Sequence, residues 1–325
     1  MRILTIGDPH FKVSNIEETD IMCNEIIKVC NERKPDLIVI LGDILDRHEL
    51  IHVSPLSRAI DFFKKLLELN IELFILIGNH DLKNNKQYLS DEHPFTSLKL
   101  LNNLTIVDKP LYKIINNFKF TFVPYIPPGR FIEALNLLDN WKDSKCIFAH
   151  QEFRGVNMGC IISTEGDLWD ITYPLVISGH IHGYNKLQNN IIYTGTPIQH
   201  NFGDSIDKSI SLFNFNINDI EEERIYLNFI KKYTFNINYN DIDNFNPLPG
   251  NNKIIISGTL AEIKSLDKNK KINEWKKNNY KVLFKNINND NFKDLDIKIK
   301  EKFSILLFNS IKHDDNLINI YKTLI

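Results

Sequence analysis

The sequence predicts an α/β protein with a large domain of parallel strands followed by a small α/β domain. Three rounds of a short apolar strand, a polar loop and a helix open the chain, with strands expected at Arg2–Ile6, Leu37–Leu41 and Leu73–Ile77. Repeated units of this kind favour parallel strands joined by right-handed crossovers. The segment 236–252 is rich in Asn, Asp and Pro, and is the expected linker between a domain at 1–235 and a domain at 253–325.

Apolar periodicity predicts the remaining elements. Helices are expected at about 16–31, with Ser14 or Asn15 as the cap and Pro35 as the stop, at about 55–69 and near 130–138. Strands near 104–107, 111–115 and 118–123 look like pieces of hairpins, and further strands are expected at 146–149, 175–177, 190–193 and 209–216. The small domain is expected to contain a strand at 253–257, a helix at about 268–277, a strand at 280–284 and terminal helices.

Composition narrows the class of protein. Hydrophobic residues make up 43% and charged residues 25% of the chain, which is ordinary for a globular protein. The net charge of -2 excludes an overall basic field, so any DNA contact must come from local patches or bound cations. The four cysteines show no zinc-type or secreted disulfide pattern, and Cys23 and Cys30 are expected to be buried thiols on a helix. With no signal peptide or long apolar span, an intracellular protein that does not enter membranes is expected.

Polar clusters follow five of the predicted strands. Their metal-ligand candidates are Asp8, His10, Asp43, Asn79, His150, His180 and His182. The loops that leave parallel strands meet at one edge of the sheet, so these side chains are expected to converge. Mixed nitrogen and oxygen ligands suit manganese, iron or zinc better than calcium or magnesium.

His80 directly follows a candidate ligand and precedes Asp81. Two cations about 3.5–4 Å apart can activate a water and steady the attacking and leaving oxygens of a phosphoester. His80 is placed to donate a proton to the leaving group, and Asp81 is expected to orient its ring. Taken singly, a strand-end Asp is usually a turn former and a lone His a structural residue. The ordered set favours a two-metal centre.

The order of these motifs resembles the calcineurin-like metallophosphoesterase superfamily over about residues 1–205. The resemblance implies a four-layer α/β/β/α sandwich with a small C-terminal capping domain. It also implies that one metal is held by Asp8, His10, Asp43 and His182. The other would be held by Asp43, Asn79, His150 and His180, with His80 as the catalytic histidine.

A downstream stretch resembles the SbcD-type nucleases, which include bacterial and phage relatives of the eukaryotic double-strand-break repair nuclease. It comprises Ile192–Pro197, Gln199, Phe202, Gly203 and Asp204. This resemblance implies manganese-dependent 3′-to-5′ exonuclease and/or endonuclease activity on DNA ends in recombination and repair. It further implies an SbcC-type, SMC-like ATPase partner, a possible homodimer, and a phage or viral origin similar to that of the phage recombination nucleases.

Some features leave alternatives open. Many family members have a histidine three places after the bridging Asp, where this chain has Asp46, so the balance of exonuclease and endonuclease activity is open. A phosphodiesterase or phosphatase acting on small molecules or protein, and a DNA-end-binding scaffold for the ATPase, are the alternative functions. Lysines around Trp275 and Tyr280 are interpreted as a solvated helix face with Trp275 in the core, or as a DNA-contact surface. The apolar segments 303–307 and 317–324 are candidates for contacting the ATPase or core helices of the small domain.

Overall fold

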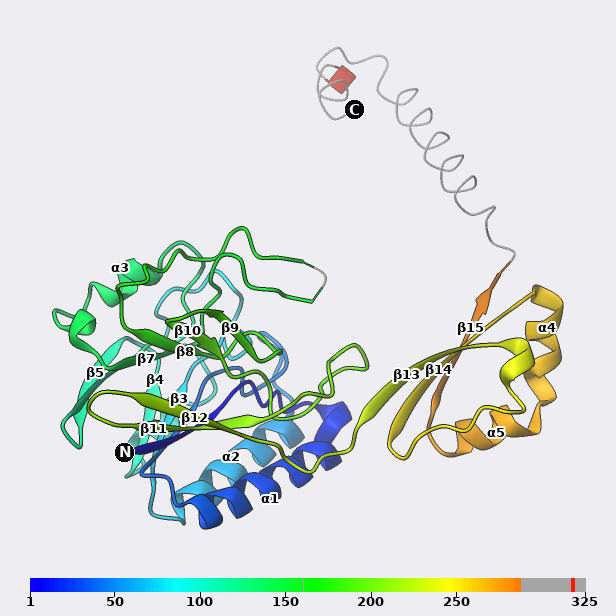
Figure 1. Ribbon diagram of the computed structural model, residues 1–325, viewed down its shortest axis with the longest axis horizontal. Helices are drawn as coiled ribbons and strands as arrows, with labels where there is room; N and C mark the ends of the chain where they lie inside the picture. Colours follow the sequence, from blue (N-terminus) through cyan, green and yellow to red (C-terminus); the bar gives the residue numbers. More distant parts are fainter. Residues whose placement is uncertain (160, 288–316, 319–325) are drawn as a thin grey trace. The chain divides into compact units, whose positions relative to one another are not determined.

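The computed structural model describes residues 1–159, 161–287 and 317–318, and the chain divides into two compact units, Met1–Lys231 and Lys232–Ile325. The large unit contains two six-stranded sheets (Figure 1). The first has the order β12-β11-β1-β2-β3-β4, from Ile220–Ile225, Ile210–Phe215, Arg2–Ile6, Leu37–Ile40, Glu72–Leu76 and Leu104–Val107. The second has the order β5-β6-β7-β8-β10-β9, from Leu111–Ile115, Phe118–Phe122, Cys146–Ala149, Leu175–Ser178, Ile191–Tyr193 and Asn185–Gln188.

Strands β1 to β4 are parallel neighbours, as are β6, β7, β8 and β10, which confirms the predicted parallel core. The prediction for 104–107 was wrong, because β4 pairs in parallel with β3 instead of forming a hairpin. The chain passes from β4 to the other sheet through Asp108, Lys109 and Pro110. Of the three strands predicted as hairpin pieces, β5 and β6 pair with each other as a hairpin.

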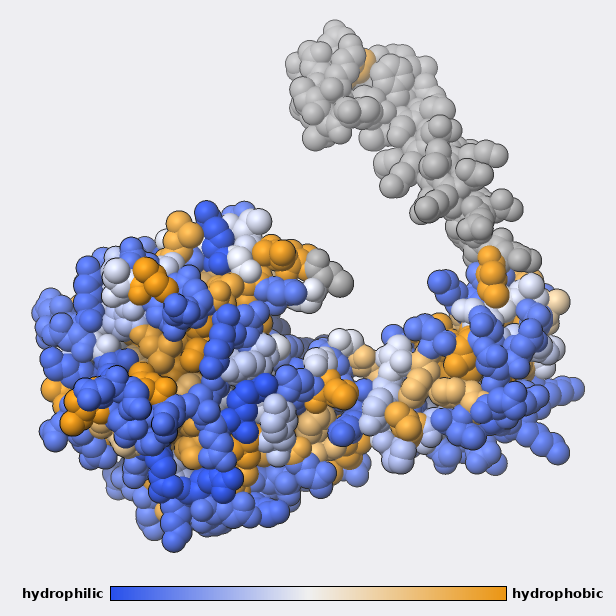
Figure 2. Space-filling view, in the orientation of Figure 1, coloured by the Kyte–Doolittle hydropathy of each residue, from blue (hydrophilic) through white to orange (hydrophobic). Residues whose placement is uncertain are grey.

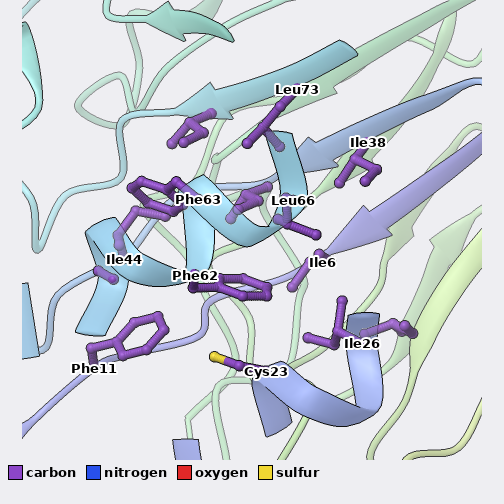
Figure 3. Packing of buried hydrophobic residues seen from close by; sticks show 14 of the residues in the cluster. Ile6, Phe11, Cys23, Ile26, Ile38, Ile44, Phe62, Phe63, Leu66 and Leu73 are labelled. Carbon is purple, nitrogen blue, oxygen red and sulfur yellow. The ribbon is translucent and has the colours of Figure 1, made fainter. Parts of the chain in front are cut away.

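Helices α1 (Ile16–Arg33) and α2 (Val53–Leu67) cover one face of the first sheet. Asn15 occupies the N-cap of α1, as predicted. The helix ends at Arg33, and its C-cap Lys34, with a left-handed backbone (φ 46°), directly precedes Pro35. Figure 3 shows side chains of α1 and α2 packing against Ile6, Ile38 and Leu73 of the strands. Cys23 and Cys30 are buried, as predicted.

The two sheets pack face to face through a second apolar cluster, in which the rings of Phe74 and Phe122 stack with centroids 4.3 Å apart. A third cluster lies on the outer face of the second sheet and includes Phe131, Trp141 and Trp169. Helix α3 (Phe131–Leu135) contributes to it but is shorter than the predicted helix at 130–138. The predicted four-layer α/β/β/α sandwich is therefore confirmed, with loops forming much of its last layer. Short 3-10 helices lie at Val13–Asn15, Thr96–Leu100 and Trp141–Asp143.

The small unit is a parallel three-stranded sheet, β13-β14-β15 (Lys232–Asn238, Asn251–Gly258 and Lys281–Asn286), with α4 (Leu260–Ser265) and α5 (Lys270–Lys277). Its core includes Ile254, Ile256, Ile272 and Trp275. It begins before the predicted boundary, because β13 starts at Lys232. The predicted linker 236–252 contains the end of β13, a 3-10 helix at Tyr239–Asp241 and the start of β14.

The segment 303–307 and most of the predicted terminal helices lie outside the described residues. Within the described ranges, no helix combines the length and the apolar character that a membrane crossing requires.

Candidate metal centre

Strand register brings the predicted polar clusters to one edge of the two sheets. Ile6 pairs with Ile40, and Ile40 pairs with Ile75. The loops after β1, β2 and β3 therefore leave the first sheet side by side at its carboxyl edge. In the second sheet Ala149 pairs with Ser178, which sets His150 beside the loop that carries His180. The candidate ligands lie together because each directly follows a buried strand.

Asn79, His150 and His180 form one group of converging donor atoms. The Oδ1 atom of Asn79 lies 2.9 Å from His150 Nε2 and 3.0 Å from His180 Nδ1, and these two nitrogens are 3.2 Å apart. Asn79 Nδ2 donates to Asn85 Oδ1, which turns Oδ1 of Asn79 toward the histidines. Ligand atoms of Asp43, His150 and His180 all lie within 4.8 Å of one another.

Asp8, His10 and His182 form a second group. The Nε2 atoms of His10 and His182 are 3.1 Å apart. Asp8 Oδ1 accepts a hydrogen bond from the backbone N–H of His180, whereas Oδ2 is buried with no hydrogen-bond partner among the described residues. Asp43 faces both groups, with Oδ1 3.4 Å from His150 Nε2 and Oδ2 3.7 Å from His10 Nε2.

These donor atoms fit divalent cations. His150 Nδ1–H donates to the carbonyl of Leu41, so in the neutral ring, the form that binds metal, the Nε2 lone pair faces the oxygens of Asn79 and Asp43. Lone pairs that face one another in a buried site repel unless positive charge lies between them. Nitrogen and oxygen donors together suit manganese, iron or zinc. Asp8, His10, Asp43 and His182 could hold one ion, and Asp43, Asn79, His150 and His180 could hold the other.

The backbone at the centre is strained. Asp8, His10, Asp43 and His180 have φ angles of 23°, 44°, 49° and 77°, in the left-handed region that side-chain-bearing residues rarely adopt. Each such residue costs roughly 1–3 kcal/mol of stability. The surrounding sheets hold these conformations, and they direct the four side chains toward the same space.

The buried carboxylates attract positive charge. Burial favours the neutral form of Asp43, but His150, His10 and His80 together outweigh it and hold the pKa of Asp43 well below 3.8. Burial likewise opposes charge on His150, but Asp43 and Asp8 raise the pKa of His150 to about 9. A bound metal would compete with this His150 proton.

Loading the centre with metal is therefore expected to release protons at pH 7. With a pKa of about 9, the His150 ring is protonated before metal binds, and a metal ligand must be the neutral ring. About one proton should leave His150, and apparent metal affinity should fall as the pH is lowered. Calorimetric titration with Mn²⁺ in buffers of different ionisation enthalpy measures this number. A binding enthalpy that does not depend on the buffer would contradict the prediction.

His80 lies at the rim of the centre. Its backbone N–H donates to Asp43 Oδ1 (2.8 Å), and its Nδ1–H donates to the backbone carbonyl of Asp46 (2.7 Å). The second ring nitrogen, Nε2, is therefore the one that can exchange a proton with a substrate. His80 also lines a cavity of about 280 Å³ together with Arg47 and Lys83.

Asp81 does not have its predicted role of orienting His80. Its carboxylate accepts hydrogen bonds from the backbone N–H groups of Gly78 (3.0 Å), Ile44 (3.2 Å) and Leu45 (2.9 Å). The sequence interpretation failed because adjacent side chains in this turn point in different directions. Asp81 ties the loop after β3 to the loop after β2, and the Asp46 carbonyl orients the His80 ring instead.

Two contacts at the centre have no signal in the sequence. The His48 ring stacks on the His80 ring, with centroids 4.6 Å apart and planes at 15°, and His48 Nδ1–H donates to the Leu82 carbonyl. Glu152 Oε2 lies 3.8 Å from His180 Nε2, and this contact lowers the pKa of Glu152. Both residues follow irregular loop paths that periodicity does not predict.

If the centre hydrolyses phosphodiesters, as the resemblance in the sequence implies, replacing His48 with alanine is expected to lower the rate about 2–10-fold, since an aromatic pair contributes about 0.5–1.5 kcal/mol. The loss should appear in kcat, because the stacked ring restricts the orientation of His80. His48→Phe keeps a flat ring and should retain most of the rate. Steady-state kinetics on one diester measure kcat for both variants. If His48→Ala and His48→Phe lost the same fraction of kcat, stacking on His80 would not be the reason for the loss.

Comparisons with known proteins match the chain to one family and to several relatives. Residues 1–184 match the family model described as calcineurin-like phosphoesterase. The chain is 46% identical to "Putative phosphoesterase 244L" of Invertebrate iridescent virus 6, over 83% of this chain and 98% of that protein. It is 28% identical to exonuclease subunit 1 of Enterobacteria phage T4, over 64% of this chain and 62% of that protein. It is 23% identical to a subunit of the nuclease SbcCD of Staphylococcus saprophyticus, over 63% of each chain.

Proposed function

This chain belongs to the calcineurin-like phosphoesterase family, and from that membership we propose that it is a two-metal DNA nuclease of the SbcD type. The observation that carries the proposal is the position of Asp43, which faces both groups of converging ligands while its Oδ1 accepts from the backbone of His80. The two relatives whose names state a nuclease activity support DNA as the substrate.

Two divalent ions, Mn²⁺ in this proposal, would activate a water and neutralise charge on the phosphodiester when bound. The Asp46 carbonyl holds His80 Nδ1–H, and the ring donates the Nε2 proton to the leaving oxygen. Asp81 keeps the loops of Asp43 and His80 together through its three backbone hydrogen bonds. Arg47 lines the cavity beside His80 and is the proposed contact to a neighbouring phosphate, whereas Lys83 in the same cavity pairs with Glu49.

The polarity of digestion tests the nuclease proposal. With Mn²⁺ and a duplex labelled at its 5′ ends, a 3′-to-5′ exonuclease shortens the label-bearing strand one nucleotide at a time. A ladder of this kind, abolished by EDTA, is expected. Intact labelled strands after prolonged incubation, with and without an SbcC-type ATPase, would contradict the proposal.

We further propose that the chain works inside cells with an SbcC-type, SMC-like ATPase in recombination or repair, and forms a homodimer. The relatives named as subunits support a multi-subunit nuclease. Co-purification of the chain with such an ATPase tests the partner directly.

The lysine-rich helix α5 is the proposed DNA-contact surface of the small unit. Lys270, Lys276 and Lys277 are exposed, and Figure 2 shows a hydrophilic surface over α5. Lys271 Nζ donates to the Asp243 carbonyl. Trp275 is 3% exposed and packs in the core, so it is not available to stack on bases.

Replacing Lys270, Lys271, Lys276 and Lys277 with serine is expected to weaken DNA binding and flatten its salt dependence. The slope of log K against log salt is negative, and each lost phosphate contact should reduce its magnitude by about 0.9. Exposed Lys28, Lys64, Lys65 and Lys109 of the large unit provide a matched control set. Fluorescence anisotropy of labelled duplex measures both slopes, and an unchanged slope in the α5 variant would exclude this surface.

A further inference from the structure

His200 is a buried histidine beside the metal centre that none of the predicted ligand sets includes. It lies in the loop after β10, and only 4% of its surface is exposed. Its backbone N–H donates to Asp204 Oδ2 (2.8 Å), and its ring Nε2–H donates to the backbone carbonyl of Asp8 (2.9 Å). The first hydrogen bond holds the backbone of His200, and the second holds its imidazole ring.

The hydrogen bond to Asp8 also fixes the tautomer of His200. A carbonyl oxygen only accepts, so Nε2 carries the hydrogen and Nδ1 keeps its lone pair. The Nδ1 atom is buried and has no hydrogen-bond partner among the described residues. A neutral imidazole with an unpaired nitrogen is the form that binds metal.

Ring spacing places His200 among the ligands of one ion. Its centroid lies 5.0 Å from that of His10 and 5.6 Å from that of His182. Each of the two ions has one pair of histidines assigned to it. The ring centroids are 5.0 Å apart within each pair, which are His10 with His182 and His150 with His180. The spacing between His200 and His10 equals that of these pairs, and the spacing between His200 and His182 is slightly longer.

We propose that His200 Nδ1 is a further ligand of the metal held by Asp8, His10, Asp43 and His182. This inference rests on the proposed metal centre and adds a ligand to it. The ion beside His200 then has three imidazole nitrogens, and the other ion has two, with the Asn79 oxygen. Imidazole favours zinc, iron and copper over manganese and magnesium, so the two positions should differ in metal preference. Zinc should bind the His200 position more tightly.

Two variants distinguish the role of the His200 Nδ1 atom from the role of its Nε2 atom. In His200→Gln the amide N–H group can replace Nε2–H as donor to Asp8, but the Nδ1 ligand is lost. In His200→Asn the side-chain oxygen can replace Nδ1, but the donor to Asp8 is lost. We expect His200→Gln to bind one of two Zn²⁺ ions about tenfold more weakly or worse, and His200→Asn to remain closer to wild type.

Competition with a chromophoric zinc chelator measures both affinities, and melting in EDTA establishes that each variant folds. Wild-type affinity for both ions in His200→Gln, with a loss in His200→Asn, would overturn the proposal and leave His200 as a positioning residue for Asp8. A crystal structure of the zinc-loaded wild type gives an answer that needs no variant. His200 Nδ1 should lie about 2.0–2.1 Å from a zinc ion, and a separation beyond about 3 Å would overturn the proposal.

DNA cleavage by the wild type, measured beside these titrations, keeps the two proposals distinct. An enzyme that uses His200 as a ligand and hydrolyses only small esters would overturn the DNA nuclease proposal while supporting the His200 ligand. A DNA nuclease whose His200→Gln variant binds both ions normally would overturn the His200 proposal alone.

Discussion

Replacing His80 with alanine is expected to lower the rate of DNA hydrolysis about 10²–10⁴-fold, the range that a positioned general acid contributes. Both ions should remain bound, because His80 is in neither predicted ligand set. The variant loses the ring whose Nδ1–H is held by the Asp46 carbonyl and whose Nε2 is the proposed proton donor. The leaving group in DNA cleavage is an alkoxide, which needs a proton. The loss of rate should therefore appear mainly in kcat.

A change of leaving group separates proton donation from other roles of His80. The nitrophenolate of bis-para-nitrophenyl phosphate needs little protonation, so His80→Ala should impair its release much less than it impairs DNA cleavage. His52→Ala removes an exposed histidine at the start of α2 and serves as the control, with wild-type rates expected on both substrates. Equal losses on both substrates, with normal metal content, would show that His80 is not the proton donor.

Replacing Gly78 with alanine is expected to abolish metal binding as well as hydrolysis. A Cβ at position 78 would overlap the backbone nitrogen and Oδ1 of Asp43, the carboxylate that faces both ligand groups. The loops after β2 and β3 would have to separate, which would also displace Asp81 from its backbone hydrogen bonds. A steric conflict of this size typically costs about 1–3 kcal/mol of stability.

Gly203→Ala is the matched control for Gly78→Ala, because a Cβ at position 203 meets nothing within 4 Å. Metal content after dialysis, together with thermal melting, measures both effects. If Gly78→Ala retained two ions and normal activity, the close approach of these loops would not be required for the centre.

The candidate ligands could be predicted from sequence because each follows a buried strand within a few residues. Strand register then determines where their backbone lies, as the pairing of Ile6 with Ile40 and of Ala149 with Ser178 shows. The role of Asp81 could not be predicted, since it depends on the direction of one side chain in a tight turn. His48 and His200 reach the centre through loops whose paths depend on the whole fold.

The boundary of the small unit shows a different failure. Tyr233, Phe235 and Ile237 alternate with more exposed residues in β13, so a period-2 pattern was present in the sequence. The abundance of Asn and Asp nearby favoured a linker instead. The composition of the segment therefore led to a wrong prediction, although its periodicity was that of a strand. In the structure this strand, β13, pairs in parallel with β14.

The most direct test of the two-metal nuclease is the ratio of kcat/KM for duplex DNA to kcat/KM for bis-para-nitrophenyl phosphate, with Mn²⁺ and with EDTA. A two-metal DNA nuclease should hydrolyse both substrates only when the metal is present, with kcat/KM far higher for DNA. Rapid Mn²⁺-dependent turnover of the small ester, with DNA untouched even when an SbcC-type ATPase is added, would contradict the nuclease function. That result would leave a phosphodiesterase with the same fold and metal centre.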